Sequence, residues 1–311
     1  MKKVMIYLLC VALLLTVVNC PMIQVEAEQT NNYELIEGVD YNYYVLENGT
    51  IEIAKYKGSE NELTIPNEID NKSVTSIGES AFRICSNLAS ITIPDSVTDI
   101  NGNPFVVCKA HIVISPDNQN LAIIDNVLFN KAEKKLISYP YGAAATAYEI
   151  PEGIISIGDS AFYSCKSLTS ITLPDSVTSI GDEAFSLCES LTSITIPDGV
   201  TSIGDEAFCS CESLTSITIP DSVTSIGDDA FSWCYSLTSI TIPDSVTSIG
   251  DRAFSRCYSL TSITIPDSVT SIGDSAFYGC ESLTLTVGHD SYAMQYAKEN
   301  GLNYQYSDAL D

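Results

Sequence analysis

Basic side chains are scarce in this sequence. Its 311 residues include 14 Lys and Arg against 40 Asp and Glu, which gives a formal net charge of −26. Because nucleic-acid binding needs basic patches, this balance argues against a nucleic-acid partner. A hydrophobic share of 45% argues equally against a disordered polyanion, which would be poor in apolar residues. The sequence therefore indicates an acidic, folded protein with enough residues for a sizeable core.

Histidine is scarcer still, with His111 and His289 as the two copies in the chain. They lie far apart in the sequence, no G-x-S-x-G or H-E-x-x-H motif occurs, and the many serines have no paired base. We expect neither a catalytic site nor a cofactor, and an enzyme is the least favoured class of function.

Long apolar runs are limited to the N-terminus. Two lysines precede the apolar run 4–18, and small or medium residues at 25–27 offer a cleavage site. The run is shorter than the roughly 20 residues of a membrane-spanning helix. Residues 1–27 are therefore predicted to be a secretory signal peptide. The alternative is lipoprotein processing at Cys20, which is disfavoured because Asn19 stands where a small residue is expected.

Nothing after the signal peptide is apolar and long enough to span a bilayer, and residues 306–311 carry neither a hydrophobic tail nor a sorting-type motif. We expect the mature chain to have no transmembrane segment and to be secreted, extracellular or on the cell surface.

Cysteines are present in a number that cannot pair completely. Cys10 and Cys20 precede the mature chain, which leaves nine of the 11. Cysteines at one repeat position are Cys85, Cys108, Cys165, Cys188, Cys211, Cys234, Cys257 and Cys280. Stacked coils place equivalent atoms about 4.8 Å apart, whereas a disulfide needs Cβ atoms about 3.5 to 4.5 Å apart and zinc needs four converging ligands. We predict a column of buried, reduced thiols and no metal site, with Cys209 as the candidate for an exposed thiol.

A repeat of fixed length dominates the sequence. Neighbouring column cysteines are 23 residues apart from Cys165 onward, and segments 213–228, 236–251 and 259–274 all read SLTSITIPDSVTSIGD. A constant period of this length is typical of a solenoid, in which each unit buries its apolar face against its neighbours. The sequence therefore predicts a repeat solenoid rather than ordinary globular domains.

One unit illustrates the expected coil. Its large or apolar positions, which we expect to point inward, are Leu168, Ile171, Leu173, Val177, Ile180, Ala184, Phe185 and Cys188. The alternation around Thr172 predicts one parallel β-strand per coil, which Pro174 ends because it has no amide hydrogen. Gly181-Asp182 is expected to cap a short helical turn that carries Ala184 and Phe185.

These units resemble BspA-like leucine-rich repeats, also called the TpLRR type. The family reads C-x-x-L-x-x-I-x-I-P followed by V-x-x-I-G-x-x-A-F, which segment 188–208 reproduces, and the likeness covers almost all of residues 33–306. It implies a leucine-rich repeat solenoid over 67–285, an N-terminal β cap over 28–66 and a C-terminal cap over 286–311.

Both caps have local sequence signals. In the N-terminal cap, segment 43–56 predicts a hairpin with a type I′ turn at Asn48-Gly49, followed by an extended segment 62–66. In the C-terminal cap, segment 291–298 predicts a helix that stops at Asn300-Gly301, before a short strand 302–306.

The repeat is interrupted at residues 109–150. Cys108 and Cys165 are 57 residues apart, and His111 stands where leucine is expected. Segments 126–129 and 135–139 predict a protruding hairpin. We favour a tolerated insertion over a dedicated site, with binding there as the alternative.

Aspartates also recur in columns, after the prolines and after the glycines. The second column comprises Asp159, Asp182, Asp205, Asp228, Asp251 and Asp274. Both columns suit capping of local turns, and calcium bridging between coils is the alternative; no EF-hand loop or glycine-rich nonapeptide is present.

Residues beside the column cysteines vary although the coils are otherwise nearly identical, and packing therefore does not dictate them. Trp233, Tyr235, Arg256 and Tyr258 bring aromatic and guanidinium groups together on this edge. Such side chains are enriched at binding hot spots. They form the predicted binding site, with neutral variation as the alternative.

The resemblance implies a cell-surface protein that adheres to host or matrix proteins or to other cells. We therefore expect a secreted or cell-surface scaffold for protein–protein interaction or adhesion, with an extracellular protein or glycan as its partner. The alternative is a carbohydrate-binding or purely structural surface protein.

Overall fold

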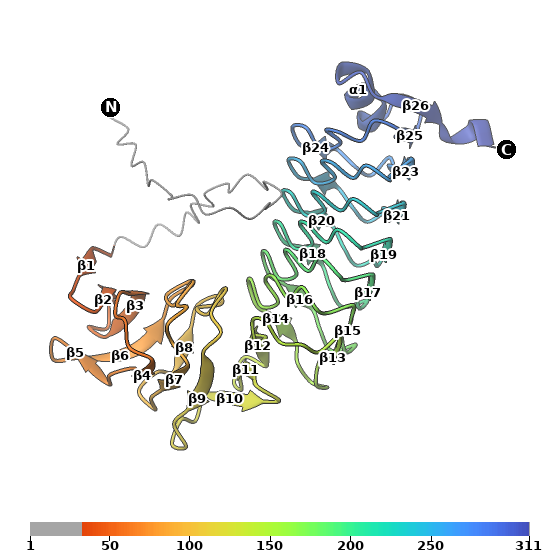
Figure 1. Ribbon diagram of the computed structural model, residues 1–311. Helices are drawn as coiled ribbons and strands as arrows, with labels where there is room; N and C mark the ends of the chain where they lie inside the picture. The colour runs from red at the N-terminus through yellow and green to blue at the C-terminus, as the bar shows by residue number, and fades with distance from the viewer. Residues whose placement is uncertain (1–32, 311) are drawn as a thin grey trace, which may run out of the picture. The chain divides into compact units, whose positions relative to one another are not determined.

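The computed structural model describes residues 33–310, which belong to one compact unit, Tyr33–Asp311. The chain winds into stacked coils, and the coils that carry β14 to β24 lie one after another (Figure 1). The predicted solenoid is confirmed. In this part of the chain, no helix is both long and apolar enough to cross a membrane.

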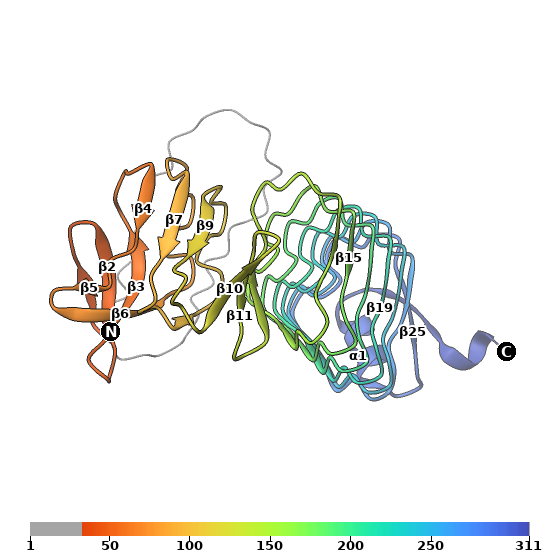
Figure 2. The same cartoon turned by 90° about the horizontal axis from the view of Figure 1, so that it is seen from below.

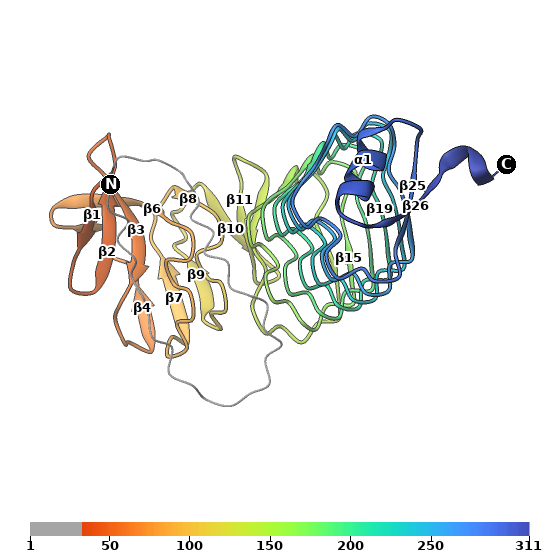
Figure 3. The same cartoon turned by 90° about the horizontal axis from the view of Figure 1, so that it is seen from above.

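Each regular coil contributes one strand to each of two sheets. The front sheet comprises β13 (Ala147–Glu149), β15 (Ser170–Thr172), β17 (Ser193–Thr195), β19 (Ser216–Thr218), β21 (Ser239–Thr241), β23 (Ser262–Thr264), β25 (Thr284–Val287) and β26 (Asn303–Tyr306). The back sheet comprises β10 (Leu121–Ile124), β11 (Val127–Asn130), β12 (Lys135–Ser138), β14 (Ser156–Ile157), β16 (Ser179–Ile180), β18 (Ser202–Ile203), β20 (Ser225–Ile226), β22 (Ser248–Ile249) and β24 (Ser271–Ile272). Both sheets are parallel except for the antiparallel pairs β10–β11 and β11–β12 in the back sheet. Seen from below and from above, β15 and β19 occupy equivalent places in coils that are two apart in the stack (Figures 2 and 3).

The N-terminal coils form two further sheets. One consists of β4 (Glu62–Thr64), β7 (Ser90–Ile93) and β9 (His111–Ile114), all parallel. The other consists of β1 (Leu35–Glu37), β2 (Tyr41–Val45), β3 (Ile51–Tyr56), β6 (Lys72–Ile77), β5 (Glu68–Ile69) and β8 (Asp99–Ile100).

Alternation along the front strands separates core from solvent. In β15, Ile171 is buried between the exposed Ser170 and Thr172, and it lies opposite Ile194 of the next coil. Because side chains alternate between the faces of a strand, each coil from β15 to β23 repeats one buried isoleucine between two exposed polar residues. Residues that are 23 apart in the sequence therefore lie opposite each other, as the period predicts.

The expected helical turn after Gly181 is wrong. Glu183 and Leu187 have φ of 54° and 59°, in the left-handed region, which breaks a right-handed helix. Instead, the N–H groups of Glu183, Phe185 and Leu187 each donate to a carbonyl of the next coil at 2.8 Å. This edge of the coil is thus a hydrogen-bonded ladder between coils rather than a helix.

Aromatic rings fill the core in a continuous stack. Neighbouring rings have centroids 5.2 to 5.6 Å apart along Phe162, Phe185, Phe208, Phe231, Phe254 and Phe277. Phe185, Phe208 and Phe231 are fully buried. A shorter stack, with both spacings at 5.6 Å, runs through Tyr56, Phe82 and Phe105.

The cysteine column is a packing feature, as predicted. The eight thiols are unpaired, and all but the half-buried Cys85 are buried. From Cys188 to Cys280, each Sγ lies 3.1 to 3.3 Å from the carbonyl oxygen of the phenylalanine 26 residues earlier. Burial raises the pKa of Cys188 and of Cys234 to about 12. Cys209 is also buried, at 3% exposure, so the expectation of an exposed thiol there is wrong.

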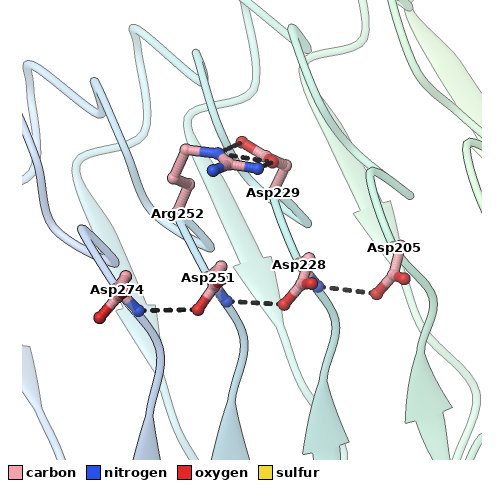
Figure 4. A network of polar contacts seen from close by, with 6 residues as sticks. All are labelled: Asp205, Asp228, Asp229, Asp251, Arg252 and Asp274. Carbon is pink, nitrogen blue, oxygen red and sulfur yellow. Dashed lines mark hydrogen bonds and ion pairs between the residues drawn. The ribbon is translucent and has the colours of Figure 1, made fainter. Parts of the chain in front are cut away.

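The second aspartate column forms an aspartate ladder between coils rather than capping its own turns (Figure 4). The N–H groups of Asp182, Asp205, Asp228, Asp251 and Asp274 donate to Oδ1 of the preceding aspartate at 2.6 to 3.1 Å. The glycine before each aspartate leaves room for this carboxylate: a Cβ on Gly204 would lie 2.6 Å from Asp182 Oδ1. No group of three or more potential metal ligands occurs within residues 33–310.

The predicted hairpin at 126–139 exists but does not protrude. The four residues of β11 are all buried, as are Leu136, Ile137 and Ser138 of β12. Side chains of one face, including Phe129 and Leu136, join the core of the regular coils, whereas Leu128 and Ile137 join the core of the N-terminal coils. Consecutive apolar residues such as Val127-Leu128-Phe129 are typical of a strand buried on both faces, which is why the hairpin lies inside the stack.

His111 does not occupy the leucine position that the cysteine spacing suggested. It pairs with Ser90 and is exposed, because two residues fewer separate it from Cys108 than separate Ser90 from Cys85. The coil is therefore shortened before its front strand.

The two caps agree with expectation except in the N-terminal turn. Strands β2 and β3 pair antiparallel, but of Asn48 and Gly49 only Gly49 has a positive φ, of 82°, so the turn is not type I′. In the C-terminal cap, α1 (Tyr292–Glu299) has Ser291 as its N-cap and precedes Gly301 at φ 67°, which confirms the predicted helix stop. The chain ends with β26 and the short helix η1 (Ser307–Leu310).

Candidate interaction site on the edge of the solenoid

The four predicted site residues come together on the turn edge of two consecutive coils. Trp233 and Arg256 occupy equivalent positions, and so do Tyr235 and Tyr258. Trp233 and Arg256 both adopt left-handed backbone, at φ 63° and 60°. Their N–H groups donate to carbonyls of the next coil, which fixes the backbone beneath the side chains. We call these four residues, together with Tyr278, the edge patch.

Ring contacts hold the edge patch together. The guanidinium carbon of Arg256 lies 4.0 Å from the centre of the Trp233 ring. The rings of Trp233 and Tyr235 meet edge to face at 5.9 Å, and those of Tyr235 and Tyr258 stack at 5.3 Å. The patch is thus an ordered surface whose side chains support one another.

Tyr278 extends the patch into the following coil. Its ring centre is 5.9 Å from the Arg256 guanidinium carbon. Tyr278 was not among the four predicted site residues. The available signal was its place two residues before Cys280, at a position that differs between the otherwise similar coils.

Exposure divides the patch into support and contact residues. Trp233, one of the four predicted binding residues, is only 9% exposed, so its side chain is largely covered rather than presented to a partner. Tyr258 and Tyr278 are 51% and 62% exposed. The tyrosines are therefore the groups available to a partner, whereas Trp233 acts mainly as a buried support for Arg256.

Charge around the patch is acidic. Between Ser167 and Asp290 the two basic residues are Arg252 and Arg256. Arg252 forms an ion pair with Asp229 at 2.9 Å (Figure 4), whereas none of the ion pairs within residues 33–310 uses Arg256. In the preceding coil, Glu212 occupies the position of Tyr235, and burial together with the charge of Glu189 raises its pKa. Within residues 33–310, Arg256 thus contacts aromatic rings rather than a carboxylate, and its surroundings are acidic.

The repeated coils match a known family of repeats. The family model described as "BspA type Leucine rich repeat region" matches six copies over residues 55–144, 138–234 and 201–287. This chain belongs to that family. The predicted resemblance is confirmed, and BspA-type repeats account for the coil with its front strand, phenylalanine stack and cysteine column.

Similar solved structures come from several bacteria. A leucine-rich repeat protein from Bacteroides ovatus is 29% identical, with 88% of this chain aligned to 67% of that chain at a TM-score of 0.51. The pneumococcal vaccine antigen PcpA is 16% identical, with 88% and 98% aligned at a TM-score of 0.59. The Treponema pallidum leucine-rich repeat protein is 23% identical, with 88% and 98% aligned at a TM-score of 0.41. No curated protein matches the chain.

Proposed function

We propose that this BspA-type protein is a secreted or cell-surface scaffold that binds other proteins through the edge patch, and that it is not an enzyme. The observation that carries the proposal is the Arg256 guanidinium beside the exposed Tyr278 ring, on backbone that hydrogen bonds to the next coil hold in place. Tyrosine and arginine dominate binding hot spots. A patch that is already ordered loses little entropy on binding.

Export is part of the proposal and rests on the signal-peptide pattern of residues 1–27, which lie outside the described residues. Family membership supports it, since the resemblance implies surface proteins that take part in adhesion. The acidic surface would attract a basic protein partner, with an association rate that falls as salt is raised.

The test is a binding screen of the mature chain against arrays of extracellular proteins and of glycans. For each confirmed protein partner, replacing Arg256 and Tyr258 by alanine is expected to weaken binding by about 2 kcal/mol or more. Tyr292→Ala is the matched control, because Tyr292 is 46% exposed but lies outside the patch. If the double variant binds every partner as tightly as the parent, the patch is not the site.

Carbohydrate binding is the second candidate, and the exposed rings of Tyr258 and Tyr278 favour it because flat aromatic faces suit sugar rings. It predicts glycan hits that the same double variant loses. A purely structural surface protein, the remaining alternative, predicts no hit on either array.

A further inference from the structure

The front sheet is interrupted where the buried hairpin enters the stack. Strand β9 ends the N-terminal sheet of β4, β7 and β9, and β13 begins the front sheet of the regular coils. Within residues 33–310, β9 pairs only with β7 and β13 pairs only with β15. Each of these two strands therefore has one open edge, although β9 and β13 are consecutive front strands in the chain.

Cavities lie along these open edges. One, of about 540 Å³, is lined by Ala145 and by every residue from Ala147 to Glu152, so it follows the whole of β13. The other, of about 610 Å³, is lined by residues 108–112 at the start of β9 and by the small residues 142–145. Asp125, Tyr139 and Ala145 line both, so the cavities adjoin. Each volume is within the range of ligand-binding pockets.

The open edge of β13 offers backbone hydrogen-bonding groups to the cavity. In a parallel pair, alternate residues of a strand bond to opposite neighbours. The Ile150 N–H donates to the Thr172 carbonyl of the β15 coil, and the Thr146 carbonyl accepts from the same coil. The backbone groups of Ala147 and Glu149 accordingly face away from β15, toward the cavity. A three-residue edge of this kind can accept an extended peptide as an added strand.

The walls of this cavity favour a positive charge. Asp125, Glu149 and Glu152 line it, no basic residue does, and none of the ion pairs within residues 33–310 uses these carboxylates. Asp125 and Asn126 have φ of 50° and 65°, so the β10–β11 turn is type I′ and places Asp125 at the junction of the two cavities. Tyr139 and Tyr148, whose rings meet at 4.9 Å, add aromatic faces that attract cations.

We propose that the open edge of β13 binds an extended, basic segment of a partner protein, which adds a parallel or antiparallel strand beside β13 and places a Lys or Arg side chain against Asp125 and Tyr148. We call this the sheet-gap site. It is a second site, separate in its residues from the edge patch, so the proposed function can fail without affecting it.

The experiment selects peptides from a random twelve-residue library on the full mature chain and measures their affinity and the amide hydrogen exchange that they slow. We expect selected peptides to be enriched in Lys and Arg and to slow the exchange of the Ala147 and Glu149 amides. Asp125→Asn combined with Glu152→Gln should weaken their binding about tenfold or more, since a lost charge contact of about 1.4 kcal/mol gives that factor.

Ala147→Pro tests the added strand itself. It removes one N–H that faces the cavity, and proline is tolerated on an edge strand whose N–H is unpaired. Peptide binding should be lost while the thermal unfolding midpoint and the exchange of β15 amides stay close to the parent. Asp175→Asn, which changes a carboxylate on a regular coil, and Arg256→Ala with Tyr258→Ala, in the edge patch, should leave peptide binding unchanged.

The proposal is overturned if the selected peptides carry no excess of basic residues, or if they slow exchange elsewhere and bind the Asp125 and Glu152 variant like the parent. Slow exchange of the β13 amides that depends on protein concentration, without added peptide, would identify a second copy of the chain as the occupant and would also overturn it.

Discussion

Arg256 lies over the Trp233 ring at 4.0 Å, and this contact joins two coils that the sequence makes almost identical. The arginine covers one face of a nearly buried indole, and its guanidinium carbon also lies 5.9 Å from the centre of the exposed Tyr278 ring. Within the edge patch, the nearly buried Trp233 therefore serves stability, whereas the exposed Tyr258 and Tyr278 are available for contact with a partner.

We expect Trp233→Ala to lower the free energy of unfolding by about 2 kcal/mol or more, because a nearly buried indole and its cation–π contact are both lost. Tyr258→Ala removes a half-exposed ring and should change stability by less than about 1 kcal/mol. Urea unfolding of the two variants compares them directly. Equal stability losses would contradict the division into support and contact residues.

Substitutions in the phenylalanine stack should lower the free energy of unfolding by more than those in the edge patch. Phe231→Ala empties a fully buried position between Phe208 and Phe254, with an expected cost of about 3 to 5 kcal/mol. Phe231→Leu keeps most of the volume and should cost clearly less. Thermal unfolding of both variants measures the difference, and similar costs would mean that ring stacking matters more than cavity volume.

The cysteine column predicts thiols that are present but unreactive. At a pH of about 8, the buried thiols should react slowly with a thiol reagent, because burial raises the pKa of Cys188 and Cys234 to about 12. Cys85 should react first, because it is half-buried whereas the other seven column thiols are buried.

Cys85→Ser is the control, because it should remove the fastest phase of the native reaction. In denaturant without reductant, all eight column thiols should react. A deficit there would reveal disulfides and would contradict the packing column.

Partly desolvated carboxyl groups predict that mild acid stabilises the fold. Partial loss of hydration is the main cause that raises the pKa of Asp182 and Asp228 above the usual 3.8, and that of Glu79 and Glu183 above 4.5. A raised pKa means that the folded state binds the proton more tightly than the unfolded state. The stabilisation is complete below the usual pKa and is lost as the pH rises through the raised value.

The thermal unfolding midpoint should therefore rise as the pH is lowered from about 7 toward the usual carboxyl pKa of about 4, at constant ionic strength. Asp182→Asn with Asp228→Asn keeps an oxygen that can accept the N–H of the next coil but cannot titrate, so the rise should be smaller in this variant. An equal rise in parent and variant would assign the effect to net charge instead.

The exact repeat made most of the fold predictable. Front strands, inward residues, the thiol column and the C-terminal helix follow from period, alternation and capping. The left-handed turns at Glu183 and Leu187 were missed because neither residue favours that backbone; hydrogen bonds from the next coil impose it.

The sequence predicts a protruding hairpin at β11 and β12 because the repeat is interrupted there and gives no register for the packing of its second face on the preceding N-terminal coils. For the edge patch, the sequence identified the four residues from variation and chemistry. It could not assign their exposure, because the burial of Trp233 depends on Arg256 one coil later.

The aspartate ladder has a consequence for how the chain finds its alignment during folding. Because successive coils are nearly identical, the N–H of Asp251 would fit the carboxylate of Asp205 as well as that of Asp228 if one coil were skipped. A skipped coil would leave a 23-residue loop, whose closure entropy is modest. In the described part of the chain, the segments that differ from the regular coils are those at the two ends of the regular array. The buried hairpin and α1 are therefore the segments that can distinguish the correct alignment of the coils from a shifted one. Misaligned molecules should accumulate when either segment is destabilised.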